Sequence, residues 1–327
     1  MILLWGLSGD GPLHEVRQSL DRSNITYTFV DQRRILETDL EFAVGSASCS
    51  VRTGNVTLDL SEVTAVYLRN YDWRKLSTIA DAGASSEEWA HAAATHEALN
   101  TWVELTDALV VNRPSAMASN SSKPYQAAII RQCGFKVPDT LITTDPDAIL
   151  NFQAIHGTLI YKSISSVRSI VSKLTDEHVH RLEDVIWCPT QFQRYIPGRD
   201  YRVHIVGDES FGSEVITDAD DYRYAGGQGK DIEIRPYEIP SDIIACARST
   251  SAALNLVFAG VDLRRTPDDE WYCFEVNPSP GFSFYQSYTG QPIADAVANL
   301  LVGVQRPRVD DHPLTVSCHG TNDHTHD

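Results

Sequence analysis

Residues 1–112 alternate short apolar runs with stretches whose apolar positions recur at helical spacing. Runs of this length between turn residues are typical of strands, and the stretches between them are typical of amphipathic helices. The predicted strands are Ile2 to Leu7, Ile25 to Val30, Val63 to Leu68 and a short run from Leu109, and the predicted helices are Pro12 to Asp21 and Ser85 to Thr106. This alternation predicts a small Rossmann-like α/β domain built on a parallel sheet.

Residues 113–190 predict a second, smaller lobe that mixes helix and strand. A helix is expected to begin at Lys123 and to end near Gly134, because glycine commonly follows the last turn of a helix. Strands are expected at 140–143 and 158–163. This mixture is the pattern of an α+β lobe.

Residues 191–304 hold the most polar strands of the chain, and a helix is expected between them from about Asp242 to Phe258. We expect this region to form another α+β lobe. Residues 305–327 carry no apolar periodicity, and they contain four of the eleven histidines. Because the spacing of these residues is irregular, a disordered, solvated tail is a better interpretation than a metal site.

Composition and charge narrow the classes of function. The 327 residues are 42% hydrophobic, which is enough for a sizeable core, and no apolar run approaches the roughly 20 residues that cross a bilayer. The amino terminus lacks the basic segment and cleavage site of an export signal, so a cytoplasmic location is expected. The six cysteines show no Cys-x-x-Cys spacing, which favours reduced thiols, mostly in the core, over disulfides or structural zinc. The net charge of -17 disfavours nucleic-acid partners.

A pair of predicted strands near the carboxyl end carries the most informative polar residues. A four-residue turn at 267–270 would join them in antiparallel register, so that alternate side chains share one face. The expected cross-strand pairs are Asp262 with Glu275, Arg264 with Cys273, Gly260 with Asn277, and Thr266 with Trp271. The side chains expected on the opposite face, in the core, are Leu263, Phe274 and Val276.

Two carboxylates placed directly opposite each other repel, so Asp262 and Glu275 require a compensating positive charge. A magnesium ion would supply it, because Asp262, Glu275 and Asn277 offer carboxylate and amide oxygens from rigid strands. The alternative is that Arg264 neutralises both acids in a surface network. The residues alone leave these two interpretations open.

Two lysines stand where a phosphate group would explain them. Lys123 lies at the start of a predicted helix, where a cation opposes the helix dipole unless an anion also binds. Lys162 ends an apolar strand and precedes a hydroxyl-rich turn that includes Ser165 and Ser166. Such a turn can aim hydroxyl groups and backbone N–H groups at phosphate oxygens. Either lysine alone is more simply a surface charge, but together with a metal hairpin they indicate a nucleoside triphosphate.

Three further segments of the sequence also fit a bound nucleoside triphosphate. The strand end at 194–196 could offer main-chain groups to an adenine edge. The next strand places Asp200, Arg202 and His204 on one face. Arg202 could clamp a phosphate, whereas His204 is interpreted as an ordinary sheet histidine. Arg223, which precedes a flexible glycine pair, could stabilise charge on a transferring phosphoryl group.

In this order the residues resemble the ATP-grasp superfamily, in the branch that contains ribosomal-protein glutamate ligases, glutathione synthetase-like enzymes and graspetide (microviridin-type) macrocyclases. The resemblance covers roughly residues 110 to 302, and it is most specific at Asp262 and in the run from Glu275 to Gly281. It implies an ATP-grasp fold, in which two α+β lobes clasp ATP, preceded by a small α/β domain.

The resemblance also implies a role for each matching residue. Two magnesium ions, or manganese in their place, would be held by Asp262, Glu275 and Asn277. The residues that contact ATP would be Lys123, Lys162, Ser165, Ser166, Gln193, Arg194, Tyr195 and Ile196, with Asp200 at the ribose. The candidate catalytic residues are Arg202, Arg223 and Arg264. The sequence departs from the family pattern at Ala225, where the glutamate ligases carry asparagine, and in the serines that replace glycines after Lys162.

Membership of this family would imply an ATP- and Mg²⁺-dependent ligase that joins a carboxylate to an amine or hydroxyl group through an acyl phosphate. The sequence does not decide whether the substrate is an amino acid, another small molecule or a peptide. It also does not decide whether the protein forms a homodimer. Tyr67 to Trp73 holds an arginine and aromatics that could grip a substrate carboxylate or form a packed turn. The alternative function is a catalytically inactive, ATP-binding partner or regulatory subunit.

Overall fold

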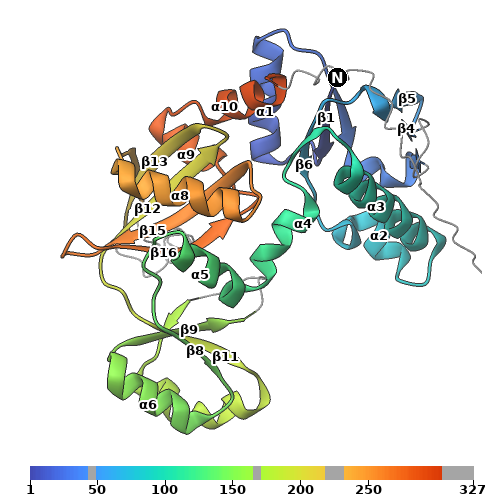
Figure 1. Cartoon of the computed structure of the whole chain (residues 1–327). Coiled ribbons are helices and arrows are strands. Elements are labelled where there is room, and N and C mark those ends of the chain that lie inside the picture. The colour runs from blue at the N-terminus through green and yellow to red at the C-terminus, as the bar shows by residue number, and fades with distance from the viewer. Residues whose placement is uncertain (43–48, 165–170, 218–231, 304–327) are drawn as a thin grey trace, which may run out of the picture.

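The structure is a computed structural model, and it describes residues 1–42, 49–164, 171–217 and 232–303. Four sheets organise the described residues, and Figure 1 shows them from the amino-terminal unit at the top to the central sheet at the bottom. The predicted tail at 305–327 lies outside the described residues.

The amino-terminal unit contains the parallel sheet that the sequence predicts. Its strand order is β2-β1-β6-β7, and all three pairings are parallel. Its main elements are β1 (Ile2–Gly6), α1 (Gly11–Arg22), β2 (Tyr27–Asp31), β6 (Ala65–Arg69), α2 (Ser77–Ala82), α3 (Glu87–Leu105) and β7 (Leu109–Val111). The turn after β1 leads directly into α1, where Asp10 caps the helix by accepting a hydrogen bond from the Leu13 N–H at 2.9 Å.

A second, antiparallel sheet in this unit was not predicted. Its strands are β3 (Thr38–Phe42), β4 (Cys49–Thr53) and β5 (Val56–Asp59), in the order β3-β4-β5, with short 3-10 turns at Gln32–Glu37, Leu60–Glu62 and Trp73–Lys75. These strands carry few buried apolar residues, so their sequence pattern is weak. Tertiary contacts hold the sheet instead, since Nε2 of His91 on α3 lies 3.1 Å from the Thr38 carbonyl oxygen.

The central sheet is antiparallel in the order β10-β9-β11-β8. Its elements are β8 (Thr140–Thr143), α6 (Pro146–His156), β9 (Leu159–Ser163), β10 (Ser172–Lys173), α7 (Asp176–Val179), a 3-10 turn at Leu182–Trp187 and β11 (Thr190–Arg194). Tyr161 and Phe192 pack beneath α6 in one core, whereas their neighbours Lys162 and Gln191 lie on the opposite face. The predicted boundary between residues 190 and 191 cuts this sheet, because β11 pairs with β8 and β9.

The largest sheet is antiparallel and has the order β14-β13-β12-β15-β16. Its elements are β12 (Arg199–Val206), β13 (Glu209–Ile216), β14 (Glu233–Pro236), α8 (Ser241–Ala253), β15 (Phe258–Arg265), β16 (Trp271–Asn277), α9 (Ser283–Thr289) and α10 (Ile293–Val302). The helix that was expected to reach Phe258 ends at Ala253, so that prediction was five residues too long at its carboxyl end. Asn255 takes a positive φ of 56°, which turns the chain into β15.

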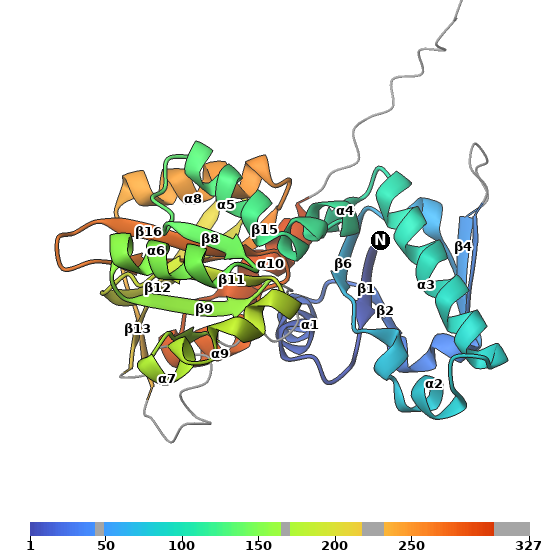
Figure 2. The ribbon, with the colours of Figure 1, turned by 90° about the horizontal axis from the view of Figure 1, so that it is seen from below.

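Helices cover both faces of this five-stranded sheet. The connection from β7 runs through α4 (Pro114–Met117) and a 3-10 turn (Ala118–Ser121) to α5 (Lys123–Gln132), which lies beside α8 on one face (Figure 2). On the other face, α10 packs between the sheet and the amino-terminal unit, in a core that includes Leu4, Phe258 and Val297. The two units therefore share one core, which fixes the amino-terminal sheet against the large sheet.

The described residues also test the expectations about membrane spans and cysteines. No helix among them is long and apolar enough to cross a membrane. The expectation that the cysteines lie mostly in the core was wrong for the described part of the chain, where Cys273 is buried but Cys188 is exposed and three others are half-buried.

Asn112 ties the end of the amino-terminal unit to the large sheet. Its Nδ2 donates hydrogen bonds to the carbonyl oxygens of Phe258 and Pro278, both at 2.6 Å. Its Oδ1 accepts hydrogen bonds from the N–H groups of Val257 and Phe258 at 3.0 and 3.3 Å. One buried carboxamide thus satisfies four backbone groups at the start of β15 and just after β16.

We predict that Asn112→Ala lowers the free energy of unfolding by about 3 kcal/mol, because it leaves buried backbone groups without partners. Urea unfolding followed by circular dichroism measures this change. Thr101→Ala is the control, since the Thr101 hydroxyl bonds an exposed helix carbonyl and its loss should cost no more than about 0.5 kcal/mol. Equal stability of the two variants would contradict the role assigned to Asn112.

Candidate active site

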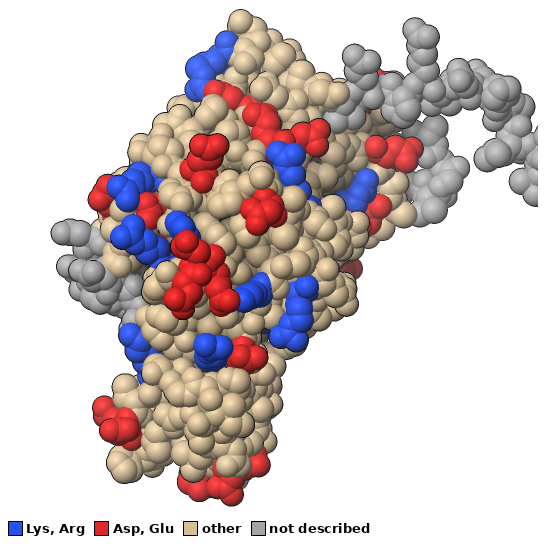
Figure 3. All heavy atoms as spheres, turned by 60° about the vertical axis from the view of Figure 1, so that its left-hand side comes forward, with Lys and Arg blue, Asp and Glu red and all other residues tan. Residues whose placement is uncertain are grey.

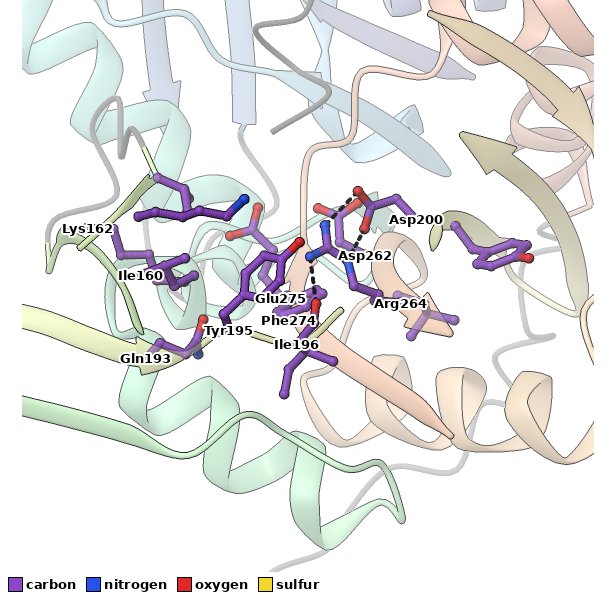
Figure 4. Close-up of a pocket in the computed structure, with 14 residues that line it drawn as sticks. Ile160, Lys162, Gln193, Tyr195, Ile196, Asp200, Asp262, Arg264, Phe274 and Glu275 are labelled. Atoms are coloured by element: carbon purple, nitrogen blue, oxygen red, sulfur yellow. Dashed lines mark hydrogen bonds and ion pairs between the residues drawn. The ribbon is translucent and has the colours of Figure 1, made fainter. Parts of the chain in front are cut away.

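A cleft lies between the central sheet and the large sheet, and it brings together residues from both (Figure 4). It holds about 760 Å³ of empty space, part of which opens to solvent. Its lining residues are Ile160, Lys162, Val171, Lys173, Gln193, Tyr195, Ile196, Asp200, Tyr201, Asp262, Leu263, Arg264, Phe274 and Glu275. Eight of these are candidate site residues from the sequence, namely Lys162, Gln193, Tyr195, Ile196, Asp200, Asp262, Arg264 and Glu275.

The hairpin of β15 and β16 confirms the most important predicted pairs. Asp262 lies opposite Glu275, and Gly260 lies opposite Asn277. Beyond Asp262 the register shifts by one residue, so Leu263 pairs with Cys273. The expected pairs of Arg264 with Cys273 and of Thr266 with Trp271 were therefore wrong. A β-bulge, which the alternation pattern does not reveal, accounts for the shift.

Phe274 is the extra residue of this bulge, and it does not lie in the core as predicted. Leu263 and Val276 are buried, but Phe274 is only half-buried and lines the cleft. The guanidinium carbon of Arg264 lies 5.2 Å from the centre of the Phe274 ring, a distance that permits a cation–π contact. The bulge thus adds an aromatic wall beside the carboxylates.

Two cross-strand ion pairs join β12 to β15. Arg202 lies opposite Asp262 and donates from Nη1 to its Oδ1 at 2.5 Å. Arg264 lies opposite Asp200 and donates to both of its carboxylate oxygens, at 2.7 and 2.8 Å. Arg264 also donates to the Ile196 carbonyl oxygen at 3.0 Å. The alternative, in which Arg264 neutralises Asp262 and Glu275, differs from the ion pairs described here, since Arg264 bonds Asp200 and Arg202 bonds Asp262.

Gly260 is required by the position of Arg202. A Cβ atom built on Gly260 would lie 1.9 Å from Nη2 of Arg202, so any larger residue would displace the guanidinium group. Arg202 is 4% exposed and crosses β15 at this point to reach Asp262. The glycine therefore belongs to the site although it carries no side chain.

Burial sets the protonation of two groups beside these pairs. Burial raises the pKa of the Cys273 thiol well above its usual value, and the charges of Asp262 and Glu275 add to this effect. Burial, together with the neighbouring Arg202 charge, holds the pKa of His204 well below its usual value. His204 is fully buried and packs against the Tyr285 ring, with the ring centres 5.0 Å apart. Both groups stay neutral near pH 7, which agrees with the interpretation of His204 as a sheet residue.

The two predicted lysines lie in adjoining spaces. Lys162 is 7% exposed and lines the main cleft and a second chamber beside it. Lys123 starts α5 as predicted and lines the second chamber. Gln126, one turn further along α5, donates to the Val276 carbonyl oxygen at 2.7 Å and accepts from the Val276 N–H at 2.9 Å. These two bonds fix α5, and hence Lys123, relative to the hairpin of β15 and β16.

Lys173 is a cleft residue that sequence reasoning missed. It follows a segment outside the described residues and belongs to the two-residue strand β10, so no periodic pattern marked it. Its Nζ lies 4.8 Å from the centre of the Tyr195 ring. The cross-strand position of β10 beside β9 brings Lys173 to the cleft, where Lys162 also lies.

Arg69 of the amino-terminal unit holds the loop that follows Asn277. Its Nη1 donates to Ser279 Oγ at 2.7 Å and to the Pro280 carbonyl oxygen at 3.2 Å. Asp10 accepts two hydrogen bonds from the same guanidinium group, both at 3.0 Å. The Ser279 N–H in turn donates to Oδ1 of Asn277 at 3.0 Å. Of the two interpretations of Tyr67 to Trp73, the packed turn therefore describes Arg69.

The donor atoms on the hairpin fit a magnesium site that is completed by a substrate. Among the described residues there is no group of three or more His, Cys, Asp or Glu that could hold a metal alone. The hairpin offers two carboxylates and the Asn277 amide oxygen, and Mg²⁺ commonly takes one or two carboxylates with substrate phosphates and water. Ser165, Ser166 and Arg223, which were also predicted as site residues, lie outside the described residues.

A family model for the RimK-like ATP-grasp domain matches residues 121–301, which is more than half of the chain. The chain therefore belongs to the RimK-like ATP-grasp family. This match confirms the resemblance found in the sequence, the predicted ATP-grasp fold and the class of enzyme, an ATP-grasp ligase. A search of curated proteins gives no match.

The fold of nearly the whole chain also recurs in solved structures. A RiPP-associated ATP-grasp ligase from Chryseobacterium gregarium, in complex with ADP and a leader and core peptide, is similar with a TM-score of 0.80 and 21% identity over 92% of this chain and 96% of that chain. The macrocyclase MdnC from Microcystis aeruginosa MRC, bound with precursor peptide MdnA, gives a TM-score of 0.78 and 23% identity over 93% and 99%. The ligase PsnB, complexed with minimal precursor, Mg and ADP, gives 0.77 and 24% over 92% and 96%. At these identities the similarity shows the fold.

We predict that Arg69→Met raises the Mg²⁺ concentration needed for half-maximal ADP binding roughly ten-fold, because the loop after Asn277 loses its anchor. Calorimetric titration of ADP at a series of Mg²⁺ concentrations measures the effect. Arg22→Met is the matched control, since Arg22 forms an exposed ion pair with Asp295 between α1 and α10. An unchanged Mg²⁺ requirement in a folded Arg69→Met protein would contradict the anchoring role.

Proposed function

We propose that this chain uses ATP and Mg²⁺ to activate a peptide carboxylate and to join it to an amine or hydroxyl group. The observation that carries the proposal is the pairing of Asp262 with Glu275 on one wall of the cleft, which Lys162 lines from the other sheet. Two facing acids are stable only beside positive charge, and Arg202 supplies part of it to Asp262. The Mg²⁺ ions that accompany a triphosphate would supply the rest of this positive charge.

The proposed metal ligands are Asp262, Glu275 and Asn277, which would hold two Mg²⁺ ions, with Mn²⁺ as a possible substitute. Bound Mg²⁺ supplies neutralisation of the charge on the phosphate oxygens during transfer. Arg202 is proposed to support this neutralisation. It bonds Asp262, and so it keeps one carboxylate oriented on the cleft wall. The loop anchored by Arg69 does the same for Asn277.

The remaining site residues would bind the nucleotide. Lys123 and Lys162 are proposed to hold phosphates, and Ser165 and Ser166, which follow Lys162 in the sequence, are proposed to assist. The apolar end of the cleft, next to the segment from Gln193 to Ile196, is proposed to receive the adenine base. Asp200, which Arg264 holds by two hydrogen bonds, is proposed to contact the ribose.

The proposed chemistry needs no nucleophile from the protein. A substrate carboxylate oxygen attacks the γ-phosphorus of ATP, the bond to the β–γ bridging oxygen breaks, and ADP leaves. The amine or hydroxyl group then attacks the acyl carbon, inorganic phosphate leaves, and the proton of the nucleophile passes to solvent or phosphate. The chain contributes orientation, charge neutralisation and exclusion of water from the acyl phosphate. Arg223 is proposed to stabilise the phosphoryl group during transfer.

A peptide is the favoured substrate because the similar structures described above include ligases bound to precursor, leader or core peptides. The match extends over at least 92% of this chain, so it includes the amino-terminal unit as well as the ATP-grasp lobes.

On the face of the described residues drawn in Figure 3, Lys and Arg are interspersed with Asp and Glu. A homodimer, a lack of nucleic-acid partners and a cytoplasmic location stay predictions from the sequence.

We predict that Glu275→Gln reduces ADP formation about 100-fold or more while the protein stays folded, because one ligand charge is lost at nearly constant volume. Coupled detection of ADP with Mg²⁺, ATP and peptide substrate measures the rate. Glu270→Gln is the control on the same hairpin, since Glu270 forms an exposed ion pair with Lys136 at the turn. Full activity of Glu275→Gln would refute the proposed metal site.

The substrate class has its own test. We predict that ADP is released with short peptides rich in Thr, Ser, Lys, Asp and Glu encoded beside this chain, and that the peptide loses one water per bond formed, as measured by mass spectrometry. ADP release with free amino acids, and none with peptides, would favour a small-molecule ligase. Nucleotide binding without ADP release in any mixture would favour the catalytically inactive partner.

A further inference from the structure

A separate hollow, which we call the amino-terminal chamber, lies between the loop after β6, helix α3 and helix α4. It holds about 1080 Å³ of empty space, part of which opens to solvent, and it shares no lining residue with the cleft or with the second chamber beside the cleft. Asn70 directly follows β6, and Pro114 begins α4 just after β7. The chamber therefore lies at the carboxyl ends of two parallel strands, where α/β sheets commonly bind ligands. Figure 1 shows α4 leading from this unit toward α5.

Hydrogen bonds hold the walls of the amino-terminal chamber in place. Gln32 is 1% exposed, and its carboxamide donates to the Tyr71 carbonyl oxygen at 2.7 Å and accepts from the Tyr71 N–H at 2.9 Å. Glu104 on α3 accepts hydrogen bonds from the N–H and the hydroxyl group of Ser115 on α4, at 2.6 and 2.8 Å. The loop after β6 and the two helices are thus fixed, and the chamber is preformed.

A chain of two hydrogen bonds joins three polar residues that line the chamber. Asn70 Nδ2 donates to Asn100 Oδ1 at 3.3 Å, and Asn100 Nδ2 donates to Nε2 of His96 at 3.0 Å. The remaining polar atom of Asn70, Oδ1, is buried and has no hydrogen-bond partner among the described residues. A buried acceptor without a donor is unfavourable, and native proteins rarely keep one unless a ligand or water completes it. This end of the chain suits a ligand that brings an N–H group.

The other end of the chain is a donor. Burial lowers the pKa of His96, so its ring is neutral near pH 7. Because Nε2 accepts from Asn100, the proton of the neutral ring lies on Nδ1, which the chain of bonds does not use. Reversing the direction of both bonds would exchange the two ends and would again leave one donor and one acceptor. The chamber therefore offers both roles to a ligand.

The charged residues of the chamber balance each other. Arg74 donates to both carboxylate oxygens of Asp72, at 2.7 and 3.2 Å. Trp73, between them in the sequence, also lines the chamber, and its ring centre lies 6.4 Å from that of His96. The chamber therefore favours a neutral ligand that carries a donor, an acceptor and apolar parts. An amide group in a peptide has this combination.

We propose that the amino-terminal chamber binds an amide group of the peptide substrate, whose N–H bonds Asn70 and whose carbonyl oxygen bonds His96. The amide comes from the peptide main chain or from an Asn or Gln side chain, and the experiment below distinguishes the two. The inference rests on the proposed function, since it concerns the substrate proposed there. It gives the peptide an anchoring point away from the ATP cleft, and a second point of attachment raises the affinity for an extended peptide.

Two small molecules test the chemistry of the chamber. N-acetylalanine methylamide presents two peptide groups, and methyl O-acetyllactate has the same skeleton with oxygen in place of both N–H groups. We expect the full-length protein to bind the amide roughly ten-fold more tightly than the ester, because only the amide supplies a donor to Asn70. NMR titration of protein with ¹⁵N-labelled tryptophan measures both, and Trp73→Phe assigns the Trp73 signal. Equal binding of amide and ester, or no change in the Trp73 signal with either, would overturn the proposal.

Propanamide distinguishes the two sources of the amide. It carries the amide group of an Asn or Gln side chain without a peptide main chain. Tighter binding of propanamide than of N-acetylalanine methylamide would assign the chamber to such a side chain, and the reverse order would assign it to the main chain.

Two variants test the residues at the ends of the hydrogen-bond chain. Asn70→Leu removes the acceptor at similar volume, and the preference for amide over ester should fall to within about three-fold. His96→Phe keeps an aromatic ring without the donor and should weaken amide binding several-fold. Asn55→Leu is the matched control, because Asn55 is exposed in the turn between β4 and β5. Thermal unfolding establishes that each variant is folded. Wild-type binding of both probes to folded Asn70→Leu and His96→Phe would contradict the assigned contacts.

Kinetics with the peptides described above test the assignment to the substrate. In Asn70→Leu the KM for the peptide should rise roughly ten-fold, while the KM for ATP should match that of Asn55→Leu, because the chamber shares no residue with the cleft. An unchanged KM for the peptide in folded Asn70→Leu would show that the substrate does not use the chamber.

The outcomes also separate this inference from the proposed function, because the titrations with small amides require no nucleotide and no turnover. If peptides support ADP formation and no amide changes the Trp73 signal, the inference is wrong while the proposed function stands. If no mixture of peptides supports ADP formation, the proposed function is wrong, and the assignment of the chamber to its substrate falls with it.

Discussion

The facing carboxylates of Asp262 and Glu275 are the constraint on which the site depends. Their positions on paired strands bring two negative charges close together, which is unfavourable unless positive charges lie nearby. The neighbouring strand places arginines there. Arg202 lies opposite Asp262, and Arg264 lies opposite Asp200 on the same two strands. Arg202 thus holds Asp262 in place, and Arg264 holds Asp200. The proposed Mg²⁺ ions would add positive charge beside Asp262 and Glu275.

Three side-chain contacts bring distant parts of the chain to this hairpin. Asn112 bonds the backbone at its beginning and just beyond its end, Gln126 bonds Val276, and Arg69 bonds the loop after Asn277. Each contact joins segments more than 140 residues apart. The hairpin is thus fixed by the amino-terminal unit and by α5 as well as by its own sheet. A metal site requires such support, because small displacements of its ligands weaken binding.

The cleft has two chemically different ends because of the alternation in its strands. On β9 and β11, Tyr161 and Phe192 turn into a core, while Lys162 and Gln193 turn toward the large sheet. The charged end gathers residues that favour phosphate and metal. At the apolar end, the Ile196 carbonyl oxygen accepts a hydrogen bond from Arg264, which links this end to the charged end. One small cleft therefore suits a ligand with a flat base and a charged tail.

The sequence by itself determined the parallel amino-terminal sheet, the pairing of Asp262 with Glu275 and the positions of Lys123 at the start of a helix and of Lys162 in a strand, because each depends on local periodicity or on one short turn. The family resemblance supplied the ATP-grasp fold and the assignment of nucleotide roles. Only the tertiary structure showed the bulge at Phe274, the position of Lys173 in the cleft, the ion-pair partner of Arg264 and the hydrogen bonds by which Arg69 holds the loop after Asn277. A bulge shifts register without changing composition, and contacts between distant segments leave no periodic trace in the chain.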